Sequence, residues 1–119
     1  GFGETVLKKQ NKIFSQLSRN NYNCTKYRVY VRGLLFVPDL DGEWINVGMV
    51  VANNSNASDA IQLQRALIIQ HALKIEKKLK LISKSLEIGY RINGTINEII
   101  VPEERFIKFG SVEVGFREE

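Results

Sequence analysis

The amino-acid sequence predicts an α+β fold in which two helices pack on a mainly antiparallel sheet of about five strands. Two segments space their apolar residues as amphipathic helices do, and the other segments are rich in β-branched and aromatic residues. Turn-forming residues lie between pairs of these β-branched and aromatic segments, which is typical of hairpins. The 119 residues, 44% hydrophobic and 25% charged, are ordinary in size and composition for one compact domain spanning residues 1–119.

The first helix is predicted over residues 5–17, where apolar side chains recur at spacings of three, four and seven residues with lysines on the other side. Residues 18–23 are rich in Asn and are expected to form the loop that follows. Residues 27–37 and 44–51 are predicted strands. Because the segment between them, 38–43, contains Pro and Asp-Gly, these two strands are predicted to form a hairpin.

The second helix, over residues 59–84, has the most regular pattern. One apolar stripe runs along it, made of Ile61, Ile68, Ala72, Ile75, Leu79 and Ile82. Its first half also carries apolar side chains on the flanks of that stripe, namely Leu63, Leu67, Ile69 and Leu73. We therefore expect this half either to be buried on two sides or to meet another chain.

Three further strands are expected after the second helix. Residues 86–93 and 96–101 are predicted to pair as a second hairpin around Asn93-Gly94, and residues 106–116 to give one more strand. The predicted order of elements is therefore α-β-β-α-β-β-β. Gly48 and Gly115 lie inside predicted strands, where glycine is typical of a bulge or of close approach by another segment.

The charged residues are unevenly distributed, although the formal net charge is only +4. Residues 5–38 hold seven basic residues and no acidic one, whereas residues 92–119 hold six acidic and three basic residues. Successive side chains of a strand point to opposite faces. We therefore predict that four residues of the first strand share one face and form a row: Lys26, Arg28, Tyr30 and Arg32.

Such a row suits a nucleic acid, because Arg and Lys neutralise phosphates and a Tyr ring can stack on a base. The sequence thus predicts a non-enzymatic nucleic-acid-binding protein, with RNA or DNA left open. Lysines of the two helices are expected to assist: Lys8, Lys9 and Lys12 of the first, and Lys74, Lys77, Lys78 and Lys80 of the second if it lies beside that face. This row is also consistent with a solvated outer sheet face, whose cations discourage edge-to-edge aggregation.

Two other functions stay open. The basic first third and the acidic last segment permit head-to-tail self-association, as expected of an oligomer or a protein-interaction module, with the second helix at the interface. A small enzyme is disfavoured, and no catalytic residue is predicted. His71 is the only histidine and Cys24 the only cysteine, and no spacing relates them as base and nucleophile.

No metal or cofactor is predicted. Asp39, Asp41 and Glu43 offer oxygen ligands to a hard cation within five residues, but turn chemistry explains an Asp before Gly better. The glycines match neither a P-loop nor a dinucleotide fingerprint. Trp44 and Met49 are expected to pack in the core, with Trp44 alternatively a binding anchor.

The longest apolar segments, 33–37 and 45–52, are much shorter than the roughly 20 residues of a membrane span. The chain begins with Gly1 rather than Met and lacks the pattern of a secretory signal, so processing or excision from a longer precursor stays open. The single cysteine favours a reducing, intracellular location.

Overall fold

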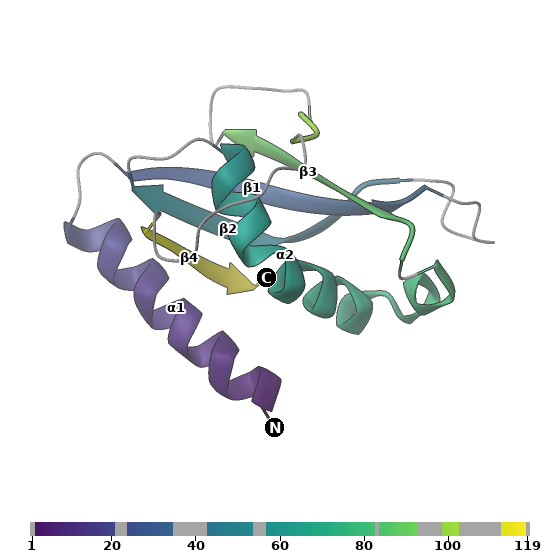
Figure 1. Cartoon of the computed structure of the whole chain (residues 1–119), viewed down its shortest axis with the longest axis horizontal. Coiled ribbons are helices and arrows are strands. Elements are labelled where there is room, and N and C mark those ends of the chain that lie inside the picture. The colour runs from purple at the N-terminus through teal and green to yellow at the C-terminus, as the bar shows by residue number, and fades with distance from the viewer. Residues whose placement is uncertain are drawn as a thin grey trace.

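The computed structural model of the chain describes residues 2–20, 24–34, 43–53, 57–82, 84–92, 99–102 and 113–118. Its elements are helix α1 (Phe2–Asn20), strands β1 (Cys24–Gly33) and β2 (Ile45–Asn53), helix α2 (Ala57–Ile75), 3-10 helix η1 (Lys77–Ile82) and strands β3 (Leu86–Ile92) and β4 (Glu113–Glu118). The four strands form one antiparallel sheet in the order β3-β1-β2-β4 (Figure 1). The predicted α+β class is confirmed.

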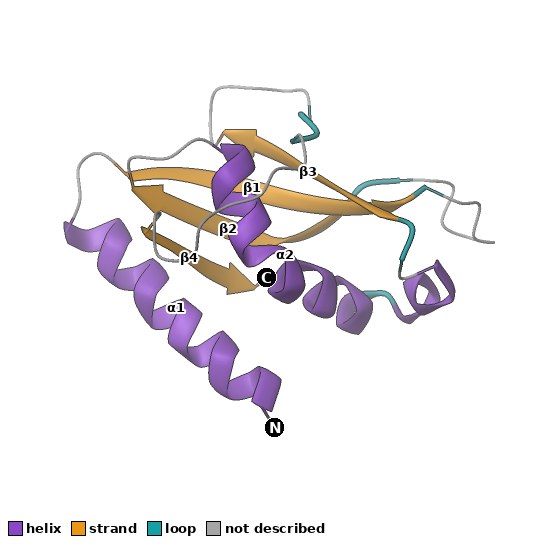
Figure 2. Ribbon diagram, in the orientation of Figure 1, coloured by secondary structure: helices purple, strands orange, loops and turns teal. Residues whose placement is uncertain are grey.

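The two helices take different places on the sheet (Figure 2). Helix α2 crosses one face and covers the main hydrophobic core, which includes Val29 and Val31 of β1, Val50 of β2 and Phe116 of β4. Helix α1 runs along the edge strand β4 and contacts β2 as well. Its Phe14 joins Met49 and Val51 in a second, smaller core on the face opposite α2. Each face of the β2–β4 half of the sheet is therefore covered by one helix.

The contact between α1 and β4 depends on Gly115. A Cβ atom at this position would lie 2.5 Å from the backbone nitrogen of Phe14 and 2.7 Å from its Cα. Because α1 meets the strand at backbone distance, a side chain here would push the helix away. The prediction that Gly115 marks a close approach is confirmed.

Polar side chains join α1 to its neighbours. Gln64 of α2 is only 4% exposed, and its Nε2 donates to Oε1 of Gln10 at 2.8 Å and to the carbonyl of Val114 at 3.4 Å. Asn11 Nδ2 donates to Glu118 Oε2 at 2.9 Å. Buried amides need such partners, so these bonds fix the position of α1 relative to both α2 and β4.

Gly48 lies at a bulge in β2, as predicted. Val29 pairs with Gly48, but the next residue, Tyr30, pairs with Asn46, so β2 gains one residue at this point. The φ of Gly48 is 159°, and a Cβ atom here would overlap the backbone oxygen of Arg117. Only glycine lets β2 bend here while staying paired with β4.

The prediction of one continuous second helix was wrong. Helix α2 ends at Ile75, and a separate 3-10 helix follows. Glu76 accounts for the break, because its Oε1 accepts from the backbone nitrogen of Lys78 at 3.2 Å and its carbonyl accepts from Leu79 at 3.1 Å. The tighter turn still returns Leu79 and Ile82 to the core, so the apolar stripe continues across the break.

Three of the four apolar side chains on the flank of α2 pack against the rest of this chain. Leu67, Ile69 and Leu73 are partly buried and pack against the main core.

On the sheet, the rings of Tyr27 and Tyr90 pack edge to face with centroids 5.4 Å apart. Burial raises the pKa of the Tyr27 hydroxyl, with a hydrogen bond to Thr25 acting in the opposite direction and Tyr90 adding a smaller upward contribution.

Element ends also differ from the predictions. Helix α1 continues to Asn20, β1 begins at Cys24, and the last strand runs from Glu113 to Glu118. Of the predicted strand 96–101, the described part forms one isolated antiparallel bridge, Tyr90 to Ile100. Residues 38–42 of the first predicted turn, the whole of the second turn and all of segment 106–112 lie outside the described residues. Along the described residues, no helix is both long enough and apolar enough to pass through a bilayer.

Candidate nucleic-acid interface

The alternation predicted for β1 is present in the structure. Tyr27, Val29 and Val31 are buried against α2. The other four residues, here called the β1 row, lie on the opposite face, with Lys26 exposed and Arg28, Tyr30 and Arg32 partly exposed. All four predicted side chains of β1 therefore share one face of the sheet.

The sheet register adds two arginines that the sequence analysis did not include. Arg28 pairs directly with Arg91 of β3 on one side and with Met49 of β2 on the other, and Met49 pairs with Arg117 of β4. We call Arg91, Arg28 and Arg117 the arginine row. It runs across all four strands, over about 14 Å at three strand spacings.

Met49 lies at the centre of this row. The Nη2 atoms of Arg28 and Arg117 each lie 3.8 Å from its Sδ atom, one from either side. Met49 is buried, as predicted, and belongs to the smaller core with Phe14. The thioether is a soft, weak acceptor and carries no negative charge.

Like charges placed directly opposite on neighbouring strands destabilise a sheet by up to about 1 kcal/mol. The pair Arg91 and Arg28 has this arrangement. A polyanion lying across the strands would neutralise them, so this juxtaposition favours a binding role.

Aromatic rings lie beside the arginine row. The Arg91 guanidinium carbon is 5.3 Å from the centre of the Tyr30 ring. Trp44, which precedes β2, reaches across β1: its Cη2 and Cζ3 atoms lie 3.0 and 3.1 Å from the point where a Cβ of Gly89 would be. A Cβ at Gly89 would also overlap Cγ2 of Ile99, so the missing side chain leaves room for both the indole and Ile99. Trp44 is partly exposed, which is consistent with its alternative role as an anchor.

Arg32 has a different role from the other arginines. Its Nη2 and Nε lie 2.7 and 2.8 Å from Glu87 Oε1, and its guanidinium carbon lies 4.3 Å from the centre of the Trp44 ring. Glu87 compensates much of its charge. Arg32 therefore contacts both Glu87 and the Trp44 ring, and its predicted contact with phosphate stays a prediction.

Helix α1 limits the accessible part of this face. It packs over Gly115 and joins Val51 and Met49 in the smaller core, and its Phe14 ring lies 4.7 Å from the Arg117 guanidinium carbon. Arg117 itself is exposed. Among the described residues, α1 leaves the β1–β3 half of this face uncovered, Ile99 covers Gly89 within that half, and Arg117 lies at its border.

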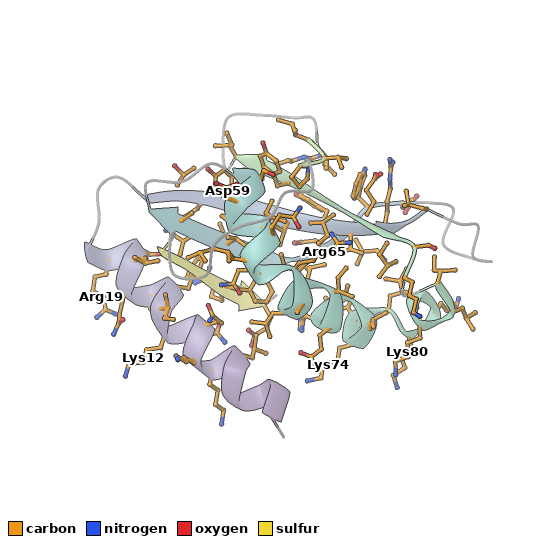
Figure 3. All side chains as sticks on the ribbon, viewed as in Figure 1. Lys12, Arg19, Asp59, Arg65, Lys74 and Lys80 are labelled. Atoms are coloured by element: carbon orange, nitrogen blue, oxygen red, sulfur yellow. The ribbon has the colours of Figure 1, made fainter. Side chains whose placement is uncertain are left out.

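The helix lysines do not extend the β1 row along the sheet. Helix α2 packs on the opposite face, so the condition for Lys74, Lys77, Lys78 and Lys80 to lie beside the row is not met. Lys8, Lys9 and Lys12 are exposed on α1, at the β4 edge. Figure 3 shows Lys12, Lys74 and Lys80 projecting away from the sheet, at the margin opposite β3.

Other predicted candidates find little support. Among the described residues, no group of three or more His, Cys, Asp and Glu side chains is placed to hold a metal ion. Asp39 and Asp41 lie outside those residues, and Glu43 is exposed. His71 is partly buried on α2, and the side chain of Cys24 is not among those described.

No family of proteins, no characterised protein and no solved structure matches this chain.

Proposed function

We propose that the chain binds single-stranded nucleic acid, RNA or DNA, on the β1–β3 half of the sheet face opposite α2. The observation that carries this proposal is the arginine row, because it aligns three cations in register across four strands. Tyr30, beside Arg91, supplies an aromatic ring next to that row.

The two kinds of side chain have separate tasks. Arg91, Arg28 and Arg117, with Lys26 at the edge, bind phosphates through charge-assisted hydrogen bonds. Tyr30 and Trp44 stack on bases, which requires that the bases are not already paired in a duplex. Stacking and phosphate contacts carry little sequence information, so we expect weak sequence preference.

A salt titration of oligonucleotide binding tests the proposal. We expect a fluorescein-labelled 12-nucleotide single strand to bind at low salt, with log K falling linearly with log salt by about 0.7 for each phosphate contact. The double variant Arg28→Gln/Arg91→Gln removes two such contacts, and the slope is expected to become shallower by about 1.4. Fluorescence anisotropy measures both quantities.

The matched control is Lys8→Gln/Lys9→Gln, which removes the same charge from exposed positions on α1. It is expected to leave the slope nearly unchanged. The proposal fails if the wild-type chain does not bind at low salt. It fails equally if the control weakens binding as much as the sheet variant does, because binding would then follow net charge alone.

A further inference from the structure

A second surface of the chain combines positive charge with exposed aliphatic side chains. It lies at the end of α2 and around η1, and we call it the η1 patch. Its members are Lys74, Ile75, Lys77, Lys78, Lys80, Leu81 and Lys84, all of them exposed. Leu81 is 81% exposed, the highest value among the large apolar residues described as exposed, and Ile75 is 43% exposed.

The geometry of η1 fixes Leu81 on the outside. A 3-10 helix has about three residues per turn, so residues three apart share a face. Leu79, 1% exposed, and Ile82 both face the core. Leu81 does not fall on this three-residue spacing, so it lies off the inward face and points outward. Leu34, 59% exposed, is at the same end of the sheet, since its backbone nitrogen donates to the carbonyl of Ser85 at 2.8 Å.

The charge around Leu81 is predominantly positive. Residues 74–84 contain five lysines and one acidic residue, Glu76. The Glu76 carboxylate also accepts a hydrogen bond from the backbone of its own turn, at Lys78. The patch therefore presents a protruding aliphatic side chain surrounded by ammonium groups on long, flexible stems.

This combination differs from the arginine row. A row of arginines with aromatic neighbours suits phosphates and bases, whereas an aliphatic leucine neither binds a phosphate nor stacks on a base as an aromatic ring does. A lipid surface offers both partners at once: anionic headgroups for the lysines and the acyl boundary beneath them for a leucine. The patch also lies on a turn at one end of the molecule (Figure 1), where a flat bilayer can approach it.

We propose that the η1 patch docks the chain on an anionic lipid bilayer, with Leu81 inserted at the headgroup boundary and the lysines among the headgroups. This docking does not depend on the proposed nucleic-acid function. Helix α2 leads into η1 on the face opposite the arginine row, so the two surfaces use different residues and their binding can be measured separately.

Sedimentation with lipid vesicles tests the proposal. We expect the wild-type chain to bind vesicles containing about a third phosphatidylserine, and not vesicles of phosphatidylcholine alone. Leu81→Ala is expected to weaken binding about tenfold through lost apolar burial. Lys77→Gln/Lys80→Gln is expected to weaken it about 25-fold, at roughly fivefold per lysine. All these positions are exposed, so the variants should fold as the wild type does.

Two control variants complete the experiment: Val101→Ala, which shortens an exposed apolar residue elsewhere, and Lys8→Gln/Lys9→Gln. Both are expected to bind vesicles nearly as the wild type does. The proposal is overturned if the wild type does not bind the anionic vesicles, or if Leu81→Ala binds them as tightly as the wild type. It is also overturned if Leu81→Ala weakens oligonucleotide binding as much as vesicle binding, since the patch would then belong to the nucleic-acid interface.

Discussion

Replacing Gly115 with alanine is expected to lower the free energy of unfolding by about 3 kcal/mol. The added methyl group would lie 2.5 Å from the backbone nitrogen of Phe14, and neither backbone can relax as a flexible side chain can. Helix α1 must move away from β4, which opens the smaller core around Met49 and strains the bond between Gln10 and Gln64. The midpoint of thermal unfolding should fall by roughly 10 °C.

Hydrogen exchange distinguishes this mechanism from general destabilisation. In Gly115→Ala, amides of α1 should lose protection while those of α2, which covers the other face, keep most of theirs. Ser15→Ala also introduces alanine, at an exposed position of α1, and should change stability by less than about 0.5 kcal/mol. Equal loss of protection in both helices would contradict the proposed contact between α1 and β4.

The variant Arg91→Glu is expected to weaken binding of single-stranded nucleic acid about a hundredfold while leaving the fold slightly more stable. Binding falls because the cation that binds a phosphate is replaced by an anion that repels it, at a cost of about 3 kcal/mol of binding free energy. Stability rises because Arg91 and Arg28 are paired in register, and a cross-strand attraction replaces a repulsion. This gain, about 1 kcal/mol, exceeds the roughly 0.5 kcal/mol lost with the contact to Tyr30.

Opposite changes in binding and stability are hard to obtain from a residue that only supports the fold. Arg91→Lys keeps the charge and should retain most of the binding without any gain in stability. Urea unfolding and anisotropy, measured on the same preparations, give both quantities. A less stable Arg91→Glu variant, with binding lost only in proportion to its unfolded fraction, would assign Arg91 a structural role.

Local patterns in the sequence predicted the elements and their faces well. The alternation along β1 placed Lys26, Arg28 and Tyr30 on the face opposite Val29, because strand geometry alone determines it. The glycine positions were equally informative: Gly48 and Gly115 mark the bulge and the close approach that glycine inside a strand indicates. These features depend on residues that are close in the sequence, so one sequence is enough to predict them.

The arrangement of strands depends on contacts far apart in the chain, and local patterns do not encode it. The arginine row exists because β3 pairs with β1 while β4 pairs with β2. Arg91 could be assigned to a strand from its neighbours, but its position opposite Arg28 requires the strand order and register. The ion pair of Arg32 with Glu87 also depends on the register of β1 and β3, so local patterns did not predict it.

The break after α2 was missed for a different reason. The apolar stripe is continuous in the sequence, because Leu79 and Ile82 return to the same core after the change of helix type. Spacing therefore could not distinguish one long helix from an α-helix followed by a 3-10 turn. The signal was the carboxylate of Glu76, whose hydrogen bond to the backbone of Lys78 starts the new turn.

The most direct test of the proposed interface is a map of amide chemical-shift changes as an unlabelled single-stranded oligonucleotide is added to nitrogen-15-labelled protein. The arginine row predicts that the largest changes lie in β1 and β3, around Arg28, Tyr30 and Arg91, and that they fade as salt is raised. Changes confined to the lysines of α1 and η1, or no changes at low salt, would contradict a nucleic-acid interface on this face of the sheet.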